Sequence, residues 1–407
     1  MTTTNSPSGG FLVTTLMLVM AALVIDGLDY QLLALVAPVI LTEWGVDRGS
    51  FGTAMAAALF GMALGAAGGG WLGDRIGRLR ALVLAVVLFG LATVTASRAD
   101  GVASLALLRV IGGIGFGAAG PNAIALVTDW LPAKWRTYAI ALLAVGTPAG
   151  GMIGALVLPV LLPLLGWRGV FVALGLAAVA LGAVLLTVLR EAPRHVATAD
   201  APCEALLSRA NLRLNAGIGA SFAALTAIVY GLNAWMPSFL TAAGFTLEQA
   251  LRASLAFNAC SIAGALAAGW LVRAAGSRVT MLGSTALTCA ALIGFGLTLD
   301  HAPAAPDLAT RVTIDTLAAS VGAFASIAVT TLYAMAAILY PPAIRASGIG
   351  LGMTLGRVGG IGMSFIGGYL LDWAGGSAVL LFGLLAACGI VATSAGWVVR
   401  EHVPRQA

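Results

Sequence analysis

The stretch Gly70–Arg80 reads "GWLGDRIGRLR" and gathers one aspartate and three arginines at the end of a segment that is otherwise apolar. The stretch Gly269–Arg278 reads "GWLVRAAGSR" and repeats this pattern, with Arg273 in place of Asp74. These stretches indicate that the chain consists of two duplicated halves. Two further pairs keep the same order: "DGLD" from Asp26 with "YGLN" from Tyr230, and "LPAKWRTYAI" from Leu131 with "YPPAIRASGI" from Tyr340.

The composition indicates a membrane protein. Hydrophobic residues make up 60% of the 407 residues and charged residues only 9%, whereas soluble domains carry about 25% charged residues. Apolar runs of about twenty residues recur along the whole chain, which is typical of helices that span a bilayer. No segment shows the alternating polarity of a membrane β-strand. We expect an all-α membrane protein whose twelve transmembrane helices form two bundles of six. The predicted spans are centred near residues 25, 62, 89, 115, 150, 179, 227, 260, 288, 325, 358 and 388.

The twelve predicted spans divide into two halves of six. The most polar interruption follows the sixth span, so we expect a first half over residues 1–190, a cytoplasmic linker over residues 191–213 and a second half over residues 214–407. Because six spans separate equivalent positions, the halves are parallel repeats related by a pseudo-two-fold axis along the membrane normal. Fourteen Lys and Arg residues fall on the side of the N-terminus and five on the other, which predicts that both termini are cytoplasmic. The N-terminus has no basic region before its first apolar run, so we expect the first span to be retained.

The charged stretch predicts a gate at the cytoplasmic face. Its glycines let helix ends approach closely, and Asp74 can pair with arginines in one conformation of the protein and not in another. The alternative is a solvated basic loop that only sets the orientation in the membrane. The residues assigned to this gate are Gly70, Asp74, Arg75, Gly77, Arg78, Asp129 and Arg136.

Two carboxyl groups, Asp26 and Asp29, lie near the middle of the first span. They are three residues apart and therefore share one face of a helix. Carboxylates at that depth face a cavity and mark proton or substrate pathways, and repulsion between the two favours binding of a proton. Since the three histidines lie outside the predicted spans, we assign proton coupling to Asp26 and Asp29. The alternative is a structural pair with an arginine of a neighbouring helix.

Two arginines, Arg109 and Arg357, lie inside the fourth and eleventh predicted spans. A guanidinium at that depth needs an anion and can hold a carboxylate by two bonds, so we assign both to a substrate site, with structural pairing as the alternative. The anion at Arg357 could be Asp26 or Asp29 in the empty protein, and Arg109 could instead help proton transfer. Three aromatic residues in the predicted spans, Tyr230, Trp235 and Tyr333, are further candidates for substrate binding; the alternative for each is a role in helix packing or in anchoring at the membrane interface. Isolated cysteines give no metal-binding pattern, and we expect no metal and no cofactor. The further candidates for substrate binding are Asn122, Tyr230, Asn233, Trp235, Asn258 and Tyr333.

The motif at Gly70 matches G-x-L-x-D-R-x-G-R, and the chain resembles the major facilitator superfamily. Over nearly its whole length it is similar to the aromatic acid:proton symporter family, through "DGLD", "GIGFGAAGPNAIALVTDWLPAKWR", "WMPSFLTAAGFTLEQA" and "RASGIGLGMTLGRVGGIGMSFIGG". Asp129 stands where that family more often has Glu, and Leu28 where an aromatic residue is commoner.

The resemblance implies proton-coupled uptake, by alternating access, of benzoate-, hydroxybenzoate- or phenylpropanoate-like acids across a bacterial inner membrane. It implies roles in transport for Asp26, Asp29, Arg109 and Arg357. The expected partners are a small aromatic carboxylate, protons and the lipid bilayer, without nucleic acid, and we expect the chain to work as a monomer.

Four other functions compete with uptake. "GTPAGGMIG" from Gly146 resembles an element of drug:proton antiporters, which makes proton-coupled efflux of drugs or other organic compounds the main alternative. A carrier of neutral solutes would leave two intramembrane arginines without an anion. An intramembrane aspartyl protease built on Asp26 and Asp29 would leave the repeat and the charged stretch unexplained, so we expect no enzyme. A sensor without transport would need a signalling domain, and the sequence predicts none.

Overall fold

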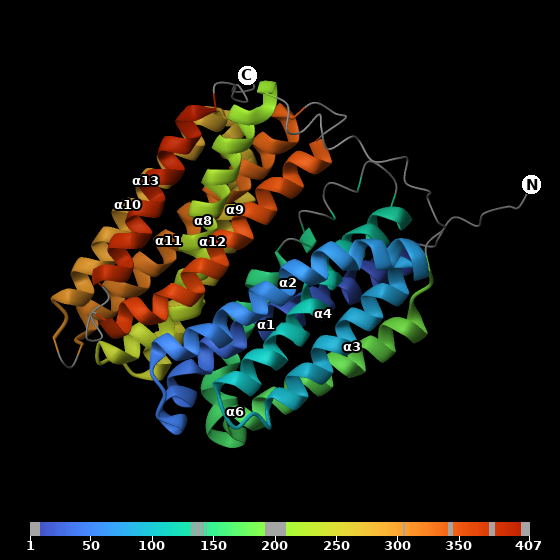
Figure 1. The fold of residues 1–407 in the computed structure, drawn as a ribbon, viewed down its shortest axis with the longest axis horizontal. Helices are drawn as coiled ribbons and strands as arrows, with labels where there is room; N and C mark the ends of the chain where they lie inside the picture. Colours follow the sequence, from blue (N-terminus) through green and yellow to red (C-terminus); the bar gives the residue numbers. More distant parts are fainter. Residues whose placement is uncertain are drawn as a thin grey trace, which may run out of the picture. The chain divides into compact units, whose positions relative to one another are not determined.

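The computed structural model describes residues 9–131, 135, 139, 142–143, 145–191, 209–303, 306–340, 345–373 and 379–399. These residues form an all-helical fold without strands, coloured along the chain in Figure 1. Eleven of its helices are long and apolar enough to cross a membrane, which confirms the expected fold class. They are α1 (Gly9–Trp44), α2 (Arg48–Ile76), α3 (Arg78–Ala96), α4 (Val102–Trp130), α6 (Gly146–Val188), α8 (Arg209–Ala242), α9 (Leu247–Ala275), α10 (Ser277–Asp300), α11 (Leu308–Leu339), α12 (Arg345–Trp373) and α13 (Val379–Val398).

Helix α6 holds two of the predicted spans. It contains 43 residues, which at 1.5 Å per residue extend over about 65 Å, roughly twice the thickness of a bilayer core. Gly166 interrupts the helical backbone with φ 62° and ψ 171°, a conformation that glycine adopts without a steric penalty. The predicted spans near residues 150 and 179 lie on either side of this break. Counted in this way, the described helices supply the twelve expected spans.

The two repeats make the same backbone turns at positions that are 199 residues apart. Gly45 and Gly244 follow α1 and α8 with φ of 62° and 90°, and Gly77 and Gly276 join α2 to α3 and α9 to α10 with φ of 109° and 82°. Positive φ is rare for residues that carry a Cβ atom. Equivalent turns at one constant spacing support the duplication that the sequence indicates.

The contacts within the chain divide it into two compact units. In the first unit, α3 packs along α4, and a core of buried apolar side chains includes Leu82, Phe89 and Leu126. In the second unit, α9 packs against α11 and α8 packs against α12. The first unit comprises residues 1–32, 57–154 and 160–197, and the second comprises residues 33–56, 155–159 and 198–407. The linker expected over residues 191–213 lies mostly outside the described residues, and the proposed boundaries of the halves stay a prediction.

Candidate functional site

Asp29 and Arg109 form a buried ion pair in the first unit. Nη2 of Arg109 lies 3.0 Å from Oδ2 of Asp29, and its Nη1 donates to the Asp29 backbone carbonyl at 3.1 Å. Thr93 of α3 donates its hydroxyl to Oδ1 of Asp29 at 2.5 Å. The two charged side chains are only 2% and 5% exposed, so each depends on the other for stabilisation. The cluster therefore joins α1, α3 and α4 at one point.

This ion pair leaves little room for a ligand. The cavity that it lines, together with Tyr30 and Phe116, has a volume of about 10 Å³, which is enough for about one water molecule. Phe171 lies against the guanidinium of Arg109, with its ring centre 5.7 Å from Cζ. The cavity beside the Asp29–Arg109 pair is therefore too small for an organic acid.

Asp26 lies one helical turn before Asp29 in a different environment. It is 2% exposed, and its Oδ1 atom is buried without a hydrogen-bond partner among the residues that the structure describes. Asp26 is close enough to Asp29 for their charges to interact. Because burial without a partner disfavours a carboxylate far more than a neutral carboxyl group, Asp26 is the candidate for binding a proton while Asp29 remains paired.

Arg357 lies on α12 in the second unit, beside two tyrosines. It is half-buried, and its guanidinium forms no ion pair with a residue in the described part of the chain. Tyr230 of α8 and Tyr333 of α11 lie close enough to interact with its charge. Tyr333 also packs edge-on against Phe222, with ring centroids 4.8 Å apart. An unpaired guanidinium next to aromatic rings suits a ligand that carries a carboxylate on an apolar ring.

Close packing of α12 against α8 brings Arg357 to this position. A side chain at Gly359 would collide with the carbonyl group of Ala223, and one at Gly360 would collide with the ring of Tyr230. Trp235 is fully buried, and its Nε1 donates to the carbonyl of Ser364 at 3.0 Å. Trp235 therefore fastens α8 to α12 next to the predicted substrate site.

The three candidate asparagines all hydrogen-bond to backbone. Asn122, Asn233 and Asn258 each donate to the carbonyl four residues earlier in the same helix, and Asn122 also donates to Gly69 of α2 at 2.8 Å. The Oδ1 atom of Asn122 is buried without a partner among the described residues. Asn122 thus ties α4 to α2, while a role of these three residues in substrate binding stays a prediction.

The predicted cytoplasmic gate contains a local ion pair. Nη2 of Arg78 lies 2.5 Å from Oδ1 of Asp74, and Nη1 of Arg78 donates to the Gly70 carbonyl at 3.3 Å. Arg75 lies over the ring of Trp71, 4.0 Å from its centre. The charged stretch therefore bends back on itself around the turn between α2 and α3.

The other end of the predicted gate is described only in part. Asp129 is half-buried at the end of α4, whereas Arg136 lies outside the described residues. Pairing between these two residues therefore stays a prediction.

Two residues that contribute to these sites, Thr93 and Glu191, could not be identified from the sequence. Thr93 lies within an apolar run, and a single hydroxyl there gives no sign that it serves Asp29. Glu191 accepts hydrogen bonds from the backbone N–H groups of Leu79 and Arg80 at 3.1 and 3.4 Å, and it stabilises the positive end of α3. The only sequence signal for Glu191 is its position as a lone carboxylate directly after the sixth apolar run.

Comparison with known proteins agrees with this fold. The model of the Major Facilitator Superfamily matches residues 19–305. The chain belongs to this superfamily. It is accordingly a multi-pass membrane transport protein and not an enzyme. The inward-open xylose transporter of E. coli shares its fold with a TM-score of 0.76 at 16% identity, over 96% of this chain and 97% of that one. A bacterial homologue of the lysosomal transporter Spinster gives 0.74 at 20% identity, over 96% and 97%.

Relatives in sequence are transporters of aromatic acids, which confirms the resemblance stated above. The gallate transporter of Pseudomonas putida is 29% identical over 94% of this chain and 90% of its own length. The 4-hydroxybenzoate transporter of Pseudomonas aeruginosa is 30% identical over 85% and 83%. The 3-(3-hydroxy-phenyl)propionate transporter of Escherichia coli is 28% identical over 91% and 90%.

Proposed function

We propose that this protein imports a small aromatic carboxylate together with protons by alternating access. The observation that carries the proposal is Arg357, which lies within a membrane-spanning helix near Tyr230 and Tyr333 and forms no ion pair with another described residue. The relatives named for gallate, 4-hydroxybenzoate and 3-(3-hydroxy-phenyl)propionate support the class of substrate, since each of these compounds carries one carboxylate on an aromatic body.

Arg357 holds the substrate carboxylate in this proposal. Its planar guanidinium offers two parallel N–H donors that match the two oxygens of a carboxylate. Tyr230 and Tyr333 contact the ring of the substrate. The tyrosines thereby select for aromatic acids over aliphatic ones of the same charge.

Asp26 carries the coupled proton. Moving an uncompensated charge through the membrane interior is unfavourable, and a protonated Asp26 leaves Arg357 and the substrate carboxylate as a neutral pair. Asp29 stays bound to Arg109 and keeps α1, α3 and α4 together around the proton site. Proton release from Asp26 on the cytoplasmic side then returns the empty transporter.

The junction of α2 and α3 acts as the cytoplasmic gate. The Asp74–Arg78 pair and the cap that Glu191 provides both lie at this junction, and they break and re-form as the transporter changes conformation. We infer from the family that the transporter has two conformations.

The transporter resides in a bacterial inner membrane with both termini cytoplasmic, and it works as a monomer. The bacterial origin of the named relatives and the excess of basic residues on one side of the predicted spans support this location.

The glycines of "GTPAGGMIG" have a packing role that does not require efflux, because a side chain at Gly150 would collide with the backbone of Val24 and Leu28.

Uptake of labelled 4-hydroxybenzoate into proteoliposomes tests the proposal. We expect accumulation with an inward proton gradient, equilibration without one, and loss of both in Arg357→Gln. A panel of aromatic acids as competitors identifies the preferred substrate. Absence of flux for every aromatic acid in the panel would reject the proposed function.

A further inference from the structure

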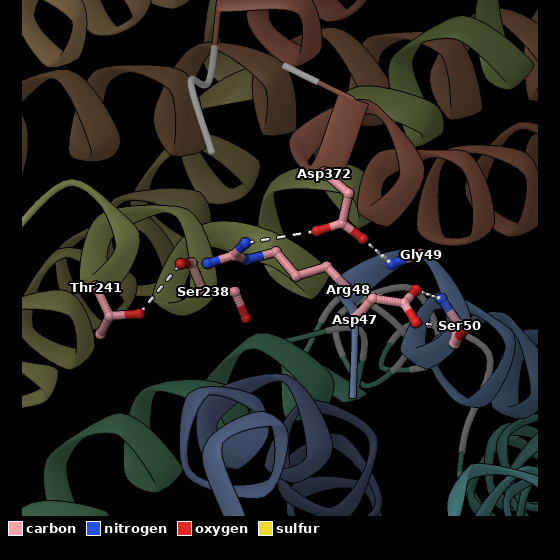
Figure 2. Close-up of polar contacts among 7 residues, drawn as sticks. All are labelled: Asp47, Arg48, Gly49, Ser50, Ser238, Thr241 and Asp372. Atoms are coloured by element: carbon pink, nitrogen blue, oxygen red, sulfur yellow. Dashed lines mark hydrogen bonds and ion pairs between the residues drawn. The ribbon is translucent and has the colours of Figure 1, made fainter. Parts of the chain in front are cut away.

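A second arginine, Arg48 at the start of α2, is only weakly paired. Its Nη1 lies 3.5 Å from Oδ1 of Asp372 at the end of α12, the outer limit for a hydrogen bond. The short bond of Asp372 goes instead to the backbone N–H of Gly49, at 2.6 Å. Figure 2 shows the Arg48 side chain extending past Asp372 toward Ser238 and Thr241 of α8. The Nε atom of Arg48 is buried without a partner among the described residues.

The guanidinium of Arg48 lines a cavity of about 640 Å³ within the second unit. This volume falls in the range of roughly 300–1,000 Å³ that small-molecule sites occupy. Ser238 also lines it, is 1% exposed, and has a hydroxyl group without a partner in the described part of the chain. A native protein rarely leaves two buried polar groups unsatisfied beside the same cavity, so the pair indicates a ligand. The apolar walls are Pro38, Val39, Leu41, Ala242 and Leu247.

The charges around the cavity favour an anion beside Arg48. Arg48 is the one cationic side chain among the residues that line it, and Glu43 is the one anionic side chain. Glu43 is exposed, so water and salt screen its charge. Asp372 is held by the N–H of Gly49 and does not line the cavity. An anion at Arg48 and Ser238 therefore gains a direct partner, and it competes with the carboxylate of Asp372 for Arg48.

The cavity is lined by equivalent segments of the two repeats, residues 38–48 and residues 238–247, and these segments differ in charge. Thr42 and Thr241, like Arg48 and Leu247, are 199 residues apart and occupy equivalent positions of the two repeats. The first repeat supplies a cation at this position and the second an apolar side chain. A ligand that carries its acid group at one end and an apolar body at the other matches this asymmetry.

We infer that this cavity is a second binding site for a small aromatic carboxylate, separate from Arg357. Arg48 holds the acid group, Ser238 donates its hydroxyl to it, and the apolar walls contact the ring. The bound carboxylate replaces the long contact between Arg48 and Asp372 with a short two-pronged one. The class of ligand rests on the proposed function, whereas the site itself rests on the cavity and its two unpartnered groups.

Photo-labelling of the purified protein with 4-azidobenzoate, followed by peptide mapping, tests the inference. We expect labels on residues 38–43 and 238–247 that excess 4-hydroxybenzoate suppresses. Arg48→Gln should lower this labelling about tenfold, the effect of losing one bond between charged groups. Arg252→Gln is the matched control, because Arg252 is an exposed arginine paired with Asp315 outside the cavity.

Two milder variants keep the test decisive if Arg48→Gln fails to fold. Ser238→Ala removes only the unpartnered hydroxyl and should lower the labelling several-fold. Asp372→Asn keeps an acceptor for Gly49 but removes the charge that competes for Arg48, and it should raise the labelling.

The outcomes separate this inference from the proposed function. Labelling that misses both segments, or that is equal in wild type and Arg48→Gln, would overturn the second site. Arg357→Gln should abolish uptake and leave the labelling of these two segments in place. A labelled cavity in a protein that takes up no aromatic acid would keep the site and discard the proposed function.

Discussion

Asp26 and Asp29 are one helical turn apart, yet they have opposite environments. Asp29 has an arginine and a threonine as partners, while Oδ1 of Asp26 has none among the described residues. Separate environments give two carboxyl groups separate tasks. Asp29 is suited to hold a permanent charge in place, and Asp26 is suited to change its charge during transport.

Asp26→Asn should abolish proton-driven accumulation. The amide has the same shape as the carboxyl group but cannot release a proton, so substrate exchange continues while coupling is lost. Proteoliposomes loaded with unlabelled 4-hydroxybenzoate should still show counterflow, while an inward proton gradient should no longer raise uptake above equilibrium. Full gradient-driven accumulation in this variant would remove Asp26 from the coupling step.

Asp29→Asn should destabilise the folded protein. The change leaves the guanidinium of Arg109 buried without its counter-charge, which costs about 3–5 kcal/mol for a pair of this kind. Thermal unfolding in detergent should show a clear drop in Tm.

Replacing both partners provides the control for this experiment. Asp29→Asn combined with Arg109→Met removes the stranded charge and should recover much of the Tm. An unchanged Tm in the single variant would mean that water or another group already stabilises Arg109.

At the scale of the helices, glycines decide how closely α12 and α8 pack. Gly359 faces the backbone of Ala223. At Gly362 on the same helix, a Cβ atom would meet no described heavy atom within 4 Å apart from the neighbouring backbone of α12 itself. These two positions therefore separate the effect of packing from the effect of helix propensity.

Gly359→Ala should lower the Tm, and Gly362→Ala should leave it unchanged or raise it slightly. Alanine in the interior of a helix is favoured over glycine by about 0.5–1 kcal/mol, and at Gly359 the collision with Ala223 outweighs this gain. Thermal unfolding of both variants measures the difference. Equal behaviour of the two would show that α12 moves away from α8 without loss.

The start of α2 provides a pH-dependent contribution to stability. Asp47 accepts hydrogen bonds from the backbone N–H and the hydroxyl of Ser50 at 2.6 and 2.8 Å, and the backbone bond in particular lowers its pKa below the ordinary value of 3.8. A lowered pKa means that the carboxylate stabilises the folded state above the unfolded pKa. This contribution is lost as the pH falls through the folded pKa.

Asp47→Ala should therefore lower the Tm at pH 6, and the difference from wild type should narrow as the pH drops below about 4. Asp47→Asn is the control, because its amide oxygen caps the helix at every pH. A constant difference between wild type and Asp47→Ala over this pH range would contradict the assignment of the cap to the charged form.

For the whole molecule, the sequence predicts what depends on local composition. The length of each apolar run predicts the spans. The predicted centres near residues 150 and 179 are too far apart for a single crossing, which is consistent with the break in α6. The sequence also marks Asp26, Asp29, Arg109 and Arg357 as candidate functional residues, because a charged side chain inside a membrane is unfavourable and is retained mainly where it has a function.

The choice of partners depends on tertiary packing and could not be predicted in this way. Nothing in the sequence says that Arg109, rather than Arg357, pairs with Asp29. Arg48 and Asp372 are 324 positions apart, and each reads as an ordinary charged residue at the end of a span. Their weak contact and the cavity beside it are visible only once the helices are in place.

The gate of the whole transporter can be tested through Asp74. The Asp74–Arg78 pair is partly exposed, at 57% and 26%, and exposed pairs contribute at most about 1 kcal/mol to stability. If the pair forms in only one conformation, even that amount shifts the balance between conformations several-fold. Asp74→Asn should therefore slow uptake several-fold while the affinity of the purified protein for 4-hydroxybenzoate changes little.

Asp100→Asn is the matched control for this change, because Asp100 is an exposed carboxylate in the turn before α4. It should leave both uptake and affinity as in wild type. A separation of rate from affinity in Asp74→Asn alone means that the charged stretch controls the interconversion of conformations. If Asp74→Asn lowered uptake and affinity in parallel, or changed neither, the charged stretch would have no role as a gate and would serve only to orient the chain in the membrane.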